Sequence, residues 1–371
     1  MRVLHIQRAK GVSGSERHLL TLLPALGALG VETRMCVLET GDGDRFVRDL
    51  RRADVDVTVQ DAGGDINLRL IPALVNEIRR YRPDVVHTHL VHADVAGQLA
   101  ARSLRVPAVS SVHATPEFWR REPYRTTGRI VGHLARRRIA ISEHVARFLR
   151  EVRLSPPERI RVVHYGIDAE GWARHAPVRA EARTTFGVSE GEIVIGVAAR
   201  LIEGKGHPTL LRAVGRAVTD DGVPFTLLIA GDGSERDQLE ALAREVCPPD
   251  RVRFLGFIDD VPGFLAACDL VAFPTDGHGE GFGLTALEAM AAGRPVVASD
   301  FASLPEVVED GRTGLLVPPS SVDALRRALV QLGLDAGARE EMGIRGAARA
   351  RDVFGLDKMA SCTLDVYEEV T

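Results

Sequence analysis

Short apolar segments rich in Val and Ile alternate with helical patterns along the whole 371-residue chain. Continuously apolar strands separated by amphipathic helices are typical of parallel sheets that helices cover on both faces. The pattern therefore predicts the α/β class. The first series of predicted strands, each followed by a pattern for a crossover helix, comprises RVLHIQ, RMCVLE, VDVTVQ, DVVHTH, AVSSVH, RIAIS and IRVVHY.

The strand pattern begins again at IVIGVAAR, residues 193–200, and continues through FTLLIAG, RVRFLG, LVAFP, PVVAS and TGLLVP. Between the two series, residues 168–190 lose strand periodicity, so we expect a linker there that joins two doubly wound, Rossmann-like domains. The final segment, LDKMASCTLDVYEEV, predicts an amphipathic helix that packs back on the first domain. The expected divisions are 1–175, 176–355 and 356–371.

Charge is distributed unevenly along a chain whose formal net charge is -4. Lys and Arg are in excess up to residue 175, and residues 101–150 alone hold eleven arginines against three acidic residues. Two interpretations stay open: a solvated helix face, or a surface that meets an anionic lipid or acceptor through residues such as Arg121 and Arg125. The acidic total and the lack of interleaved aromatic residues argue against nucleic acid as a partner.

The four cysteines lie far apart, without a CxxC pair, so we expect reduced side chains. The first residues, MRVLHIQ, have a strand pattern, and no apolar segment approaches the length that spans a bilayer. We therefore expect a cytoplasmic protein, with contact to the inner face of the cell membrane through the basic first domain as an alternative.

The segment EGFGLTALEAM places Glu280 and Glu288 eight positions apart. Gly281 and Gly283 predict that Glu280 lies in a loop and that Glu288 lies about one turn inside the following helix. This spacing argues against a pair of glycosidase carboxylates around one bond, and favours an extended ligand with a hydroxyl at each end. The N–H groups of Gly283 and Leu284 at the helix start would suit a phosphate. The alternative is a helix with a solvated glutamate at each end.

Two cations follow the first predicted strand of the second domain, in ARLIEGKG. Arg200 ends that strand, and Lys205 lies in the next loop, just before a helix that opens at His207 and Pro208. Because strand ends of open α/β sheets bind ligands, an Arg fork and a Lys point charge there suit a diphosphate. A basic loop without a ligand is the alternative.

The first loop of the chain, in RAKGVSGSERHLL, predicts another helix start that can receive an anion. Ser13 and Glu16 have the spacing of a capping box, and Gly14 lies between them. The loop lacks GxGxxG, which argues against a dinucleotide site.

Two patterns could be mistaken for metal sites. The DxD-like sequences Asp42-Gly43-Asp44 and Asp54-Val55-Asp56 fall in a predicted surface turn and at the start of a predicted strand. His87 and His89 lie on one strand face, but no carboxylate ligand is evident beside them, so we favour packing, or His89 lining an acceptor pocket. We expect no metal and no other cofactor.

The quoted motifs of both domains, together with IAGDGSERDQLE and FLGFIDD, resemble the retaining glycosyltransferase family 4. The similarity extends over essentially the whole chain and is densest between Gly196 and Pro319. The resemblance implies a GT-B fold, in which two Rossmann-like domains face an interdomain cleft and the C-terminal helix crosses back to the first domain.

The resemblance also implies site residues. Glu288 would hold the ribose of a nucleoside diphosphate sugar, Glu280 would contact the transferred sugar, and His113, in SVHATP, would lie beside the anomeric carbon. The expected catalytic residues are His113, Glu280, Arg200 and Lys205. The expected donor-binding residues are Gly14, Arg200, Lys205, Phe257, Ile258, Glu280, Gly281, Phe282, Gly283, Leu284 and Glu288. The expected acceptor-side residues are His89, Arg121 and Arg125.

The implied reaction is transfer of a hexose to an acceptor hydroxyl by front-face attack with retention, without a metal. We expect a UDP-sugar, with GDP-mannose as the alternative, and either an anionic or lipid-linked acceptor or a soluble small molecule. A sugar-nucleotide epimerase and a non-catalytic sugar-nucleotide-binding protein remain as alternatives. Tyr165, where the family commonly has Asn, and His278, in the loop before Glu280, depart from the family pattern.

Overall fold

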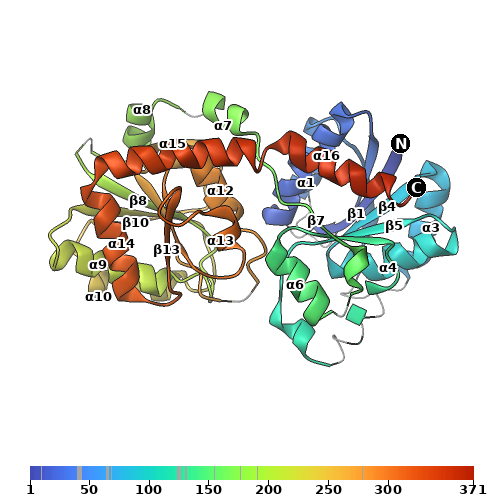
Figure 1. The fold of residues 1–371 in the computed structure, drawn as a ribbon, viewed down its shortest axis with the longest axis horizontal. Helices are drawn as coiled ribbons and strands as arrows, with labels where there is room; N and C mark the ends of the chain where they lie inside the picture. The colour runs from blue at the N-terminus through green and yellow to red at the C-terminus, as the bar shows by residue number, and fades with distance from the viewer. Residues whose placement is uncertain are drawn as a thin grey trace. The chain divides into compact units, whose positions relative to one another are not determined.

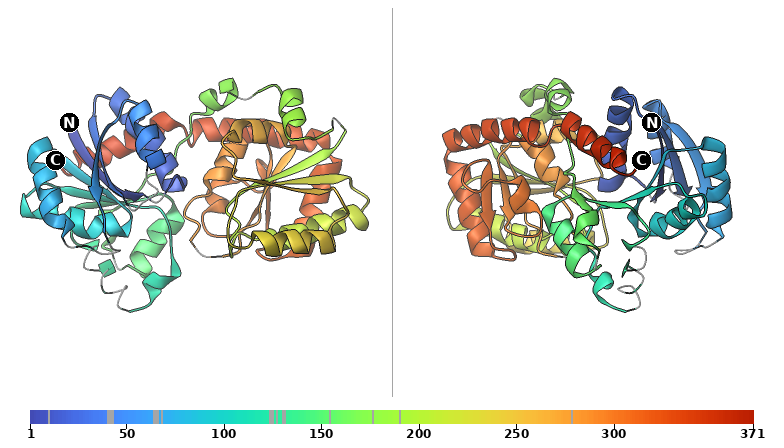
Figure 2. Two further views of the ribbon diagram at one scale, coloured as in Figure 1. Left: turned by 180° about the vertical axis from the view of Figure 1, so that it is seen from behind. Right: turned by 45° about the vertical axis from the view of Figure 1, so that its right-hand side comes forward.

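The computed structural model describes residues 1–9, 11–39, 44–63, 67, 69–122, 126, 128–129, 132–153, 155–175, 177–189, 191–277 and 279–371. The chain divides into two compact units, Met1–Gly166 with Leu356–Thr371, and Ile167–Gly355. Each unit is a parallel sheet with helices on both faces (Figures 1 and 2). Among the described residues, no helix is both long and apolar enough to cross a membrane.

The first unit contains seven parallel strands in the order β3-β2-β1-β4-β5-β6-β7. Its strands are β1 (Arg2–Ala9), β2 (Glu32–Glu39), β3 (Asp56–Asp61), β4 (Val85–His89), β5 (Ala108–Val112), β6 (Arg137–Ala140) and β7 (Ile160–Val162). Its helices are α1 (Gly14–Ala28), α2 (Asp44–Arg52), α3 (Leu70–Tyr81), α4 (Leu90–Ser103), η1 (Glu117–Arg120), α6 (Glu143–Glu151), η2 (Pro157–Arg159) and α16 (Leu356–Glu368).

Alternation along the buried strands builds a core on each face of this sheet. Val3 on β1 packs in the cluster that α1 and α16 cover, and its neighbour Leu4 packs in the cluster that α3 and α4 cover. Successive side chains of a strand point to opposite faces, so a strand covered on both faces must be apolar throughout. Helix α16, the last in the chain, packs against α1, next to the start of the first unit.

The second unit contains six parallel strands in the order β10-β9-β8-β11-β12-β13. Its strands are β8 (Ile193–Ala198), β9 (Phe225–Ala230), β10 (Val252–Gly256), β11 (Leu270–Phe273), β12 (Val296–Ser299) and β13 (Gly314–Val317). Its helices are α7 (Ala169–His175), α8 (Arg179–Thr185), α9 (His207–Thr219), α10 (Arg236–Val246), α11 (Val261–Ala267), α12 (Leu284–Ala291), α13 (Leu304–Val307), α14 (Val322–Leu334) and α15 (Ala336–Asp352).

The boundary between the units lies at Gly166 rather than at residue 175. The segment expected to be a linker forms α7 and α8 and belongs to the second unit. Helix α8 is held there because Ala182 packs against Ala266 and Ala267 of α11. The buried Arg183 guanidinium also donates to the Glu192 carbonyl at 2.6 Å. Two short helices have no strand periodicity in their sequence, which is why this segment resembled a linker.

Both sheets reverse their strand order at one place. In the first unit this switch point lies between β1 and β4, and in the second unit between β8 and β11. The crossovers run in opposite directions from that place, so the loops at the carboxyl ends of the two strands separate and leave room for a ligand. The switch points are therefore where functional residues are expected.

Candidate functional site

The second switch point is shaped by glycines in the loops after β8 and β11. Gly206 has a φ of +70°, and a Cβ there would lie 1.8 Å from the Pro274 carbonyl oxygen. The Gly204 carbonyl accepts hydrogen bonds from the Gly277 N–H at 3.0 Å and from the Thr275 hydroxyl at 2.7 Å. Only glycine allows this approach, so the two loops are held together around Lys205.

Lys205 and Glu280 meet at this switch point. The Lys205 Nζ donates to the Glu280 Oε2 at 2.9 Å, and the two side chains are 22% and 13% exposed. The two residues are brought together from the loops after β8 and β11, as the sequence motifs indicated. Partial burial strengthens the field of these charges, because less water screens them than at an open surface.

Helix α12 begins next to this ion pair, with Gly283 as its N-cap at a φ of +93°. The sequence predicted that the Gly283 N–H would be available to a phosphate. In this structure it donates instead to the Glu280 Oε1 at 3.0 Å. Glu280 therefore connects Lys205 to the helix start. Glu288 lies on α12 and is only 5% exposed.

The remaining predicted donor residues differ in exposure. Arg200, two residues beyond β8, is exposed, and Phe257, next to the end of β10, is 58% exposed. Ile258 is half-buried. Phe282 is 2% exposed and packs edge-on against Phe354, with ring centroids 5.6 Å apart. Its side chain is part of the core, so only its backbone remains as a candidate contact for a ligand. Gly281 is buried and Leu284 is half-buried.

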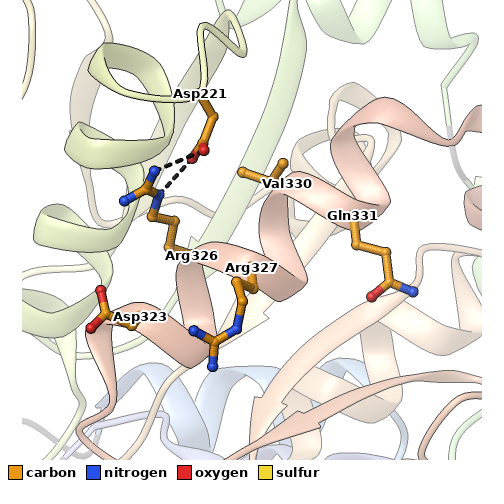
Figure 3. Close-up of a pocket in the computed structure, with 6 residues that line it drawn as sticks. All are labelled: Asp221, Asp323, Arg326, Arg327, Val330 and Gln331. Carbon is orange, nitrogen blue, oxygen red and sulfur yellow. Dashed lines mark hydrogen bonds and ion pairs between the residues drawn. The ribbon is translucent and has the colours of Figure 1, made fainter.

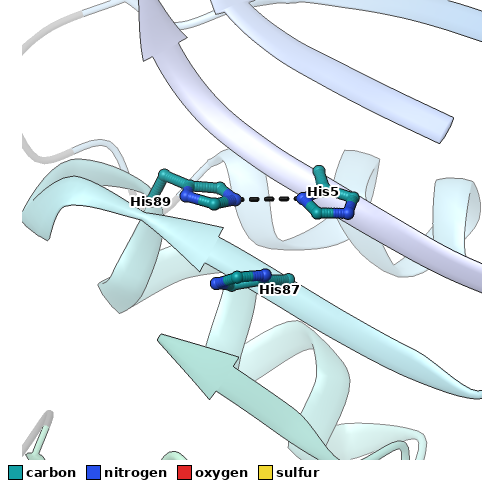
Figure 4. Close-up of side chains that lie close together, drawn as sticks. All are labelled: His5, His87 and His89. Atoms are coloured by element: carbon teal, nitrogen blue, oxygen red, sulfur yellow. Dashed lines mark hydrogen bonds between the residues drawn. The ribbon is translucent and has the colours of Figure 1, made fainter. Parts of the chain in front are cut away.

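Histidines gather at the first switch point, where β1 and β4 pair in register with His5 opposite His87 (Figure 4). His5 Nδ1 lies 3.0 Å from His89 Nε2, and His89 Nδ1 lies 3.1 Å from His113 Nε2. His5, His87 and His89 are fully buried, and His113 is 8% exposed. His89 is thus a buried residue, which fits the packing alternative, and its place on the acceptor side stays a prediction.

His113 follows β5 and uses both ring nitrogens within the first unit. Its Nε2 faces His89, and its Nδ1 lies 2.6 Å from the Tyr165 hydroxyl. Burial lowers the pKa of His113 to about 3 and that of His5 to about 3. Burial, followed by repulsion from His87, lowers the pKa of His89 well below its ordinary value. The ring of His113 is therefore neutral at physiological pH.

Sequence reasoning missed the residues that surround His113. His5 and Tyr165 belong to this hydrogen-bonded group, and His18 of α1 stacks on the Tyr165 ring with centroids 4.3 Å apart. A signal was present, because polar residues recur at alternate positions near the ends of otherwise apolar strands, as in HIQ of β1 and HTH of β4. On fully buried strands such residues must find partners inside the unit.

Gly14 begins α1, and the capping box predicted before it is present. The Glu16 Oε2 accepts from the Ser13 N–H at 3.0 Å. Gly14 does not have a positive φ, and a Cβ there would have no heavy atom within 4 Å among those described. Neither backbone strain nor packing within the described residues thus requires a glycine at this position.

The described basic residues of the first unit differ in their surroundings. Arg121 is exposed, and Arg125 lies outside the described residues. In the 136–138 run, Arg136 donates to the Val370 carbonyl at 3.0 Å and Arg137 to Glu369 at 2.6 Å, which ties β6 to the C-terminal segment. Arg138 is fully buried. This run is structural, which weakens the interpretation of a basic face for an anionic partner.

Among the described residues, no aspartate of the DxD-like sequences belongs to a group that could hold a metal ion. Asp42 and Gly43 lie outside the described residues, and Asp56 opens β3 and accepts from the Arg34 Nε at 2.6 Å. His278 likewise lies outside the described residues. The cysteines are free, as expected from their spacing.

A cavity of about 460 Å³ lies elsewhere on the second unit, beside α14 (Figure 3). Arg326 crosses it to donate to the Asp221 Oδ1 at 2.7 Å. None of the sequence-predicted site residues is among its lining residues, which are Asp221, Asp323, Arg326, Arg327, Val330 and Gln331. Asp323 of this cavity also pairs with Arg216 of α9 at 3.0 Å, so two of its acidic side chains already have basic partners, and we do not assign the cavity to the site.

Known proteins match both units. Residues 178–349 match the family model described as Glycosyl transferases group 1, and residues 12–170 match that of Glycosyltransferase Family 4. A D-inositol 3-phosphate glycosyltransferase of Streptomyces bingchenggensis is 33% identical over 309 residues, which cover 77% of this chain and 66% of that relative. A 2-deoxystreptamine glucosyltransferase of Streptomyces kanamyceticus is 33% identical over 311 residues, which cover 79% of each chain.

Among solved structures, HepE of Anabaena in complex with UDP-glucose superposes with a TM-score of 0.85 over 100% of both chains. At 24% identity this likeness shows the fold alone. The relatives above are named as transferases, so the epimerase and the non-catalytic binding protein are set aside. The chain belongs to the family 4 glycosyltransferases and is a glycosyltransferase with the GT-B fold.

Proposed function

We propose that this glycosyltransferase moves a hexose from a UDP-sugar to an acceptor hydroxyl, with retention of the anomeric configuration and without a metal. The observation that carries the proposal is the position of Lys205, which meets Glu280 at the second switch point. The complex of HepE with UDP-glucose, a protein of the same fold, supports a uridine donor over GDP-mannose.

The chemistry requires positive charge at the leaving group. When the bond between sugar and diphosphate breaks, negative charge develops on the departing phosphate, and fixed cations lower the barrier. Lys205 and the exposed Arg200 would supply that charge from the loop after β8. In this proposal the diphosphate displaces part of the Lys205–Glu280 interaction, and Glu280 turns to the sugar hydroxyls.

Two further residues would hold the ends of the donor. Glu288 on α12 would accept hydrogen bonds from the ribose hydroxyls, and Phe257, with 58% of its surface exposed, lies after β10 in the segment expected to meet the base. Gly14 would let the phosphates approach the start of α1, because it carries no side chain that could lie between them and the helix N–H groups.

Proton transfer in this proposal needs no side-chain base. The acceptor hydroxyl attacks the anomeric carbon on the face that the diphosphate leaves, and its proton passes to the departing phosphate oxygen. His113 is a poor candidate for a base, because burial lowers its pKa to about 3 and Tyr165 occupies its Nδ1. Its part would be to pack beside the transferred sugar.

The two named relatives support a class of acceptor. Inositol 3-phosphate and 2-deoxystreptamine are both cyclohexane rings that carry hydroxyls, the first an anion and the second a cation. We therefore propose a soluble cyclitol acceptor. The structural role of the 136–138 arginines supports this over a lipid-linked acceptor, because it removes much of the expected basic surface.

Donor binding is tested by thermal unfolding with UDP, GDP, ADP and dTDP in the presence of a chelator, because a ligand that binds only the folded state raises the midpoint. We expect a shift with UDP that is lost in Glu288→Gln and kept in Glu245→Gln, an exposed glutamate of α10. A shift with GDP alone would overturn the uridine assignment. A shift that needs added Mn²⁺ or Mg²⁺ would overturn metal independence.

Transfer is tested with UDP-glucose and either inositol 3-phosphate or 2-deoxystreptamine, with product stereochemistry read from the anomeric coupling constant in NMR. We expect an α-linked product with one of the two acceptors. A β-linked product would contradict retention, and hydrolysis of the donor with neither acceptor used would contradict a cyclitol acceptor.

A further inference from the structure

Three histidines of the first unit form a hydrogen-bonded row that ends at a tyrosine. The row runs from His5 Nδ1 to His89 Nε2, from His89 Nδ1 to His113 Nε2, and from His113 Nδ1 to the Tyr165 hydroxyl, over 3.0, 3.1 and 2.6 Å. A neutral imidazole has one N–H and one lone pair. Each bond in the row therefore fixes the direction of the next.

The distance at the tyrosine end indicates the direction. N–H donors lie about 2.7–3.2 Å from their acceptors, whereas O–H donors approach to about 2.5–3.0 Å. The 2.6 Å separation between Tyr165 and His113 thus fits an O–H that donates to Nδ1. His113 then carries its proton on Nε2 and donates it to His89 Nδ1. His89 in turn donates its Nε2–H to His5 Nδ1.

A second tyrosine would set the same direction for His87 if its hydroxyl is also the donor. The Tyr367 hydroxyl lies 2.7 Å from His87 Nδ1, and His87 Nε2 lies 2.8 Å from the Ser111 Oγ. A phenol that donates to Nδ1 leaves an Nε2–H to donate to the serine. Two tyrosines from different parts of the chain would then give all four histidines the same tautomer.

We propose that Tyr165 is a positioning residue for His113, and that through its hydroxyl it holds His113 as the neutral Nε2–H tautomer, with His89 as the acceptor. The ring of Tyr165 is itself held, because it is 4% exposed and stacks on His18. The inference rests on the proposed function only where it gives His113 a place beside the transferred sugar. Tyr165 keeps His113 from acting as a base, because its hydroxyl occupies the lone pair of Nδ1.

The same histidines could be taken for a metal centre, because one nitrogen from each of His5, His87 and His89 lies within 4.8 Å of the others. The ring geometry favours the hydrogen bonds. The rings of His5 and His89 are only 11° from parallel and direct nitrogens at each other over 3.0 Å, so a lone pair from each cannot converge on one ion without a rotation (Figure 4). Tyr367 and Ser111 also engage both nitrogens of His87.

The test is ¹H–¹⁵N multiple-bond NMR of the full chain labelled at histidine, with His113 assigned from a His113→Gln variant. We expect wild-type His113 to give the Nε2–H pattern and not to titrate between pH 6 and 8. In Tyr165→Phe, which keeps the ring that stacks on His18, the Nδ1–H form should become populated. The matched control Tyr367→Phe should change the tautomer of His87 and leave that of His113 unchanged.

Two NMR results would overturn the proposal: an Nδ1–H or protonated His113 in the wild type, or a His113 pattern that Tyr165→Phe does not alter. Retention of one Zn²⁺ per chain after dialysis would also overturn it, because the ion would take the acceptor of His113. If Tyr165→Phe does not fold, a second pair decides. His89→Asn and His89→Phe both leave the Tyr165 hydroxyl on Nδ1, so both should keep the Nε2–H form of His113, and a change to the Nδ1–H form in either would overturn the proposal.

Kinetics separate this inference from the proposed function. If the chain transfers glucose from UDP-glucose, Tyr165→Phe should lower kcat by about tenfold, the equivalent of one hydrogen bond, with KM for the donor unchanged. An equal rise in KM would indicate a contact with the donor instead of positioning, and would overturn it. If no sugar nucleotide is a substrate, the proposed function fails while the NMR result still decides the tautomer.

Discussion

The two switch points of this molecule have the same topology and opposite chemistry. Between β8 and β11, glycines allow two loops to approach each other around the partly exposed ion pair of Lys205 and Glu280. Between β1 and β4, the strands themselves carry His5, His87 and His89, which are fully buried and neutral. One place presents charge in its loops, and the other encloses polar groups within its sheet.

The difference follows from what each half of the proposed reaction needs. A leaving diphosphate requires charge that is already in place, which Lys205 provides. The region around His113 would face a sugar and an acceptor, where a titrating base could promote hydrolysis by water, and a fixed neutral ring excludes that. Strand order alone therefore does not give function, because the side chains at the switch point decide it.

The largest effect is expected on acidification, which acts on the buried histidines His5 and His113 of the first unit. Above pH 6.5 they are neutral in both the folded and the unfolded state. Below pH 6.5 the unfolded chain binds protons that the folded chain refuses, because burial lowers the pKa of His5 and His113 to about 3. The free energy of unfolding should fall by about 1.4 kcal/mol per pH unit for each such histidine. Urea midpoints at pH 7, 6 and 5 measure this, and equal midpoints would contradict it.

A second prediction concerns the charge at the second switch point. Lys205→Ala should lower kcat by about 10²–10³-fold, the loss typical when one preorganised group is removed from a developing charge. Lys358→Ala, at an exposed position of α16, is the control and should leave kcat unchanged. Initial rates with UDP-glucose measure the effect. An equal fall in kcat for both variants would mean that Lys205 acts only through the net charge of the protein and not through its position.

Two glycines distinguish a requirement of the fold from a requirement of the ligand. Gly206→Ala should lower the free energy of unfolding by at least about 1–3 kcal/mol, because it strains the backbone and meets the Pro274 carbonyl.

Gly14→Ala should instead raise the free energy of unfolding by about 0.4–1 kcal/mol, because its conformation suits alanine, while it weakens UDP binding. Thermal midpoints with and without UDP measure both glycine variants. A destabilised Gly14→Ala would contradict the stability prediction, and a variant that binds UDP normally would show that Gly14 has no role in the donor site.

The smallest expected effect on the transfer rate concerns Tyr367 of the last helix, whose hydroxyl lies 2.7 Å from His87 Nδ1. Tyr367→Phe should lower the free energy of unfolding by about 1–3 kcal/mol, because it leaves a buried nitrogen without its donor. The transfer rate should not change, since His87 has no hydrogen bond to His113 among those found. A loss of activity without a loss of stability would place His87 in the reaction.

The sequence predicted every strand of both sheets, because continuous apolar segments between helical patterns have few other solutions. The family resemblance also assigned Lys205 and Glu280 to one donor site, and the structure brings the two side chains together at 2.9 Å. It could not predict that Glu280 would bond the Gly283 N–H, since that depends on the angle at which the loop enters α12.

The buried histidines show another limit of sequence reasoning. Tyr165 and His113 are far apart in the chain, and Tyr367 comes from its last helix, so no local pattern connects them. The contacts of Arg136 and Arg137 could not be predicted for the same reason. Their partners Val370 and Glu369 lie at the other end of the chain. Arginines that are adjacent in the sequence therefore make separate contacts in the structure.

The place of α16 has a consequence for the order of events during synthesis. The second unit is one continuous stretch, Ile167–Gly355, whereas the first unit is complete only when Leu356–Thr371 has been added. On the ribosome the unit that emerges first must therefore finish folding last, with the apolar surface that Met359, Val366 and Tyr367 cover still exposed. A truncation that removes α16 should leave the nascent first unit as a client for chaperones and proteases, while the second unit can already fold.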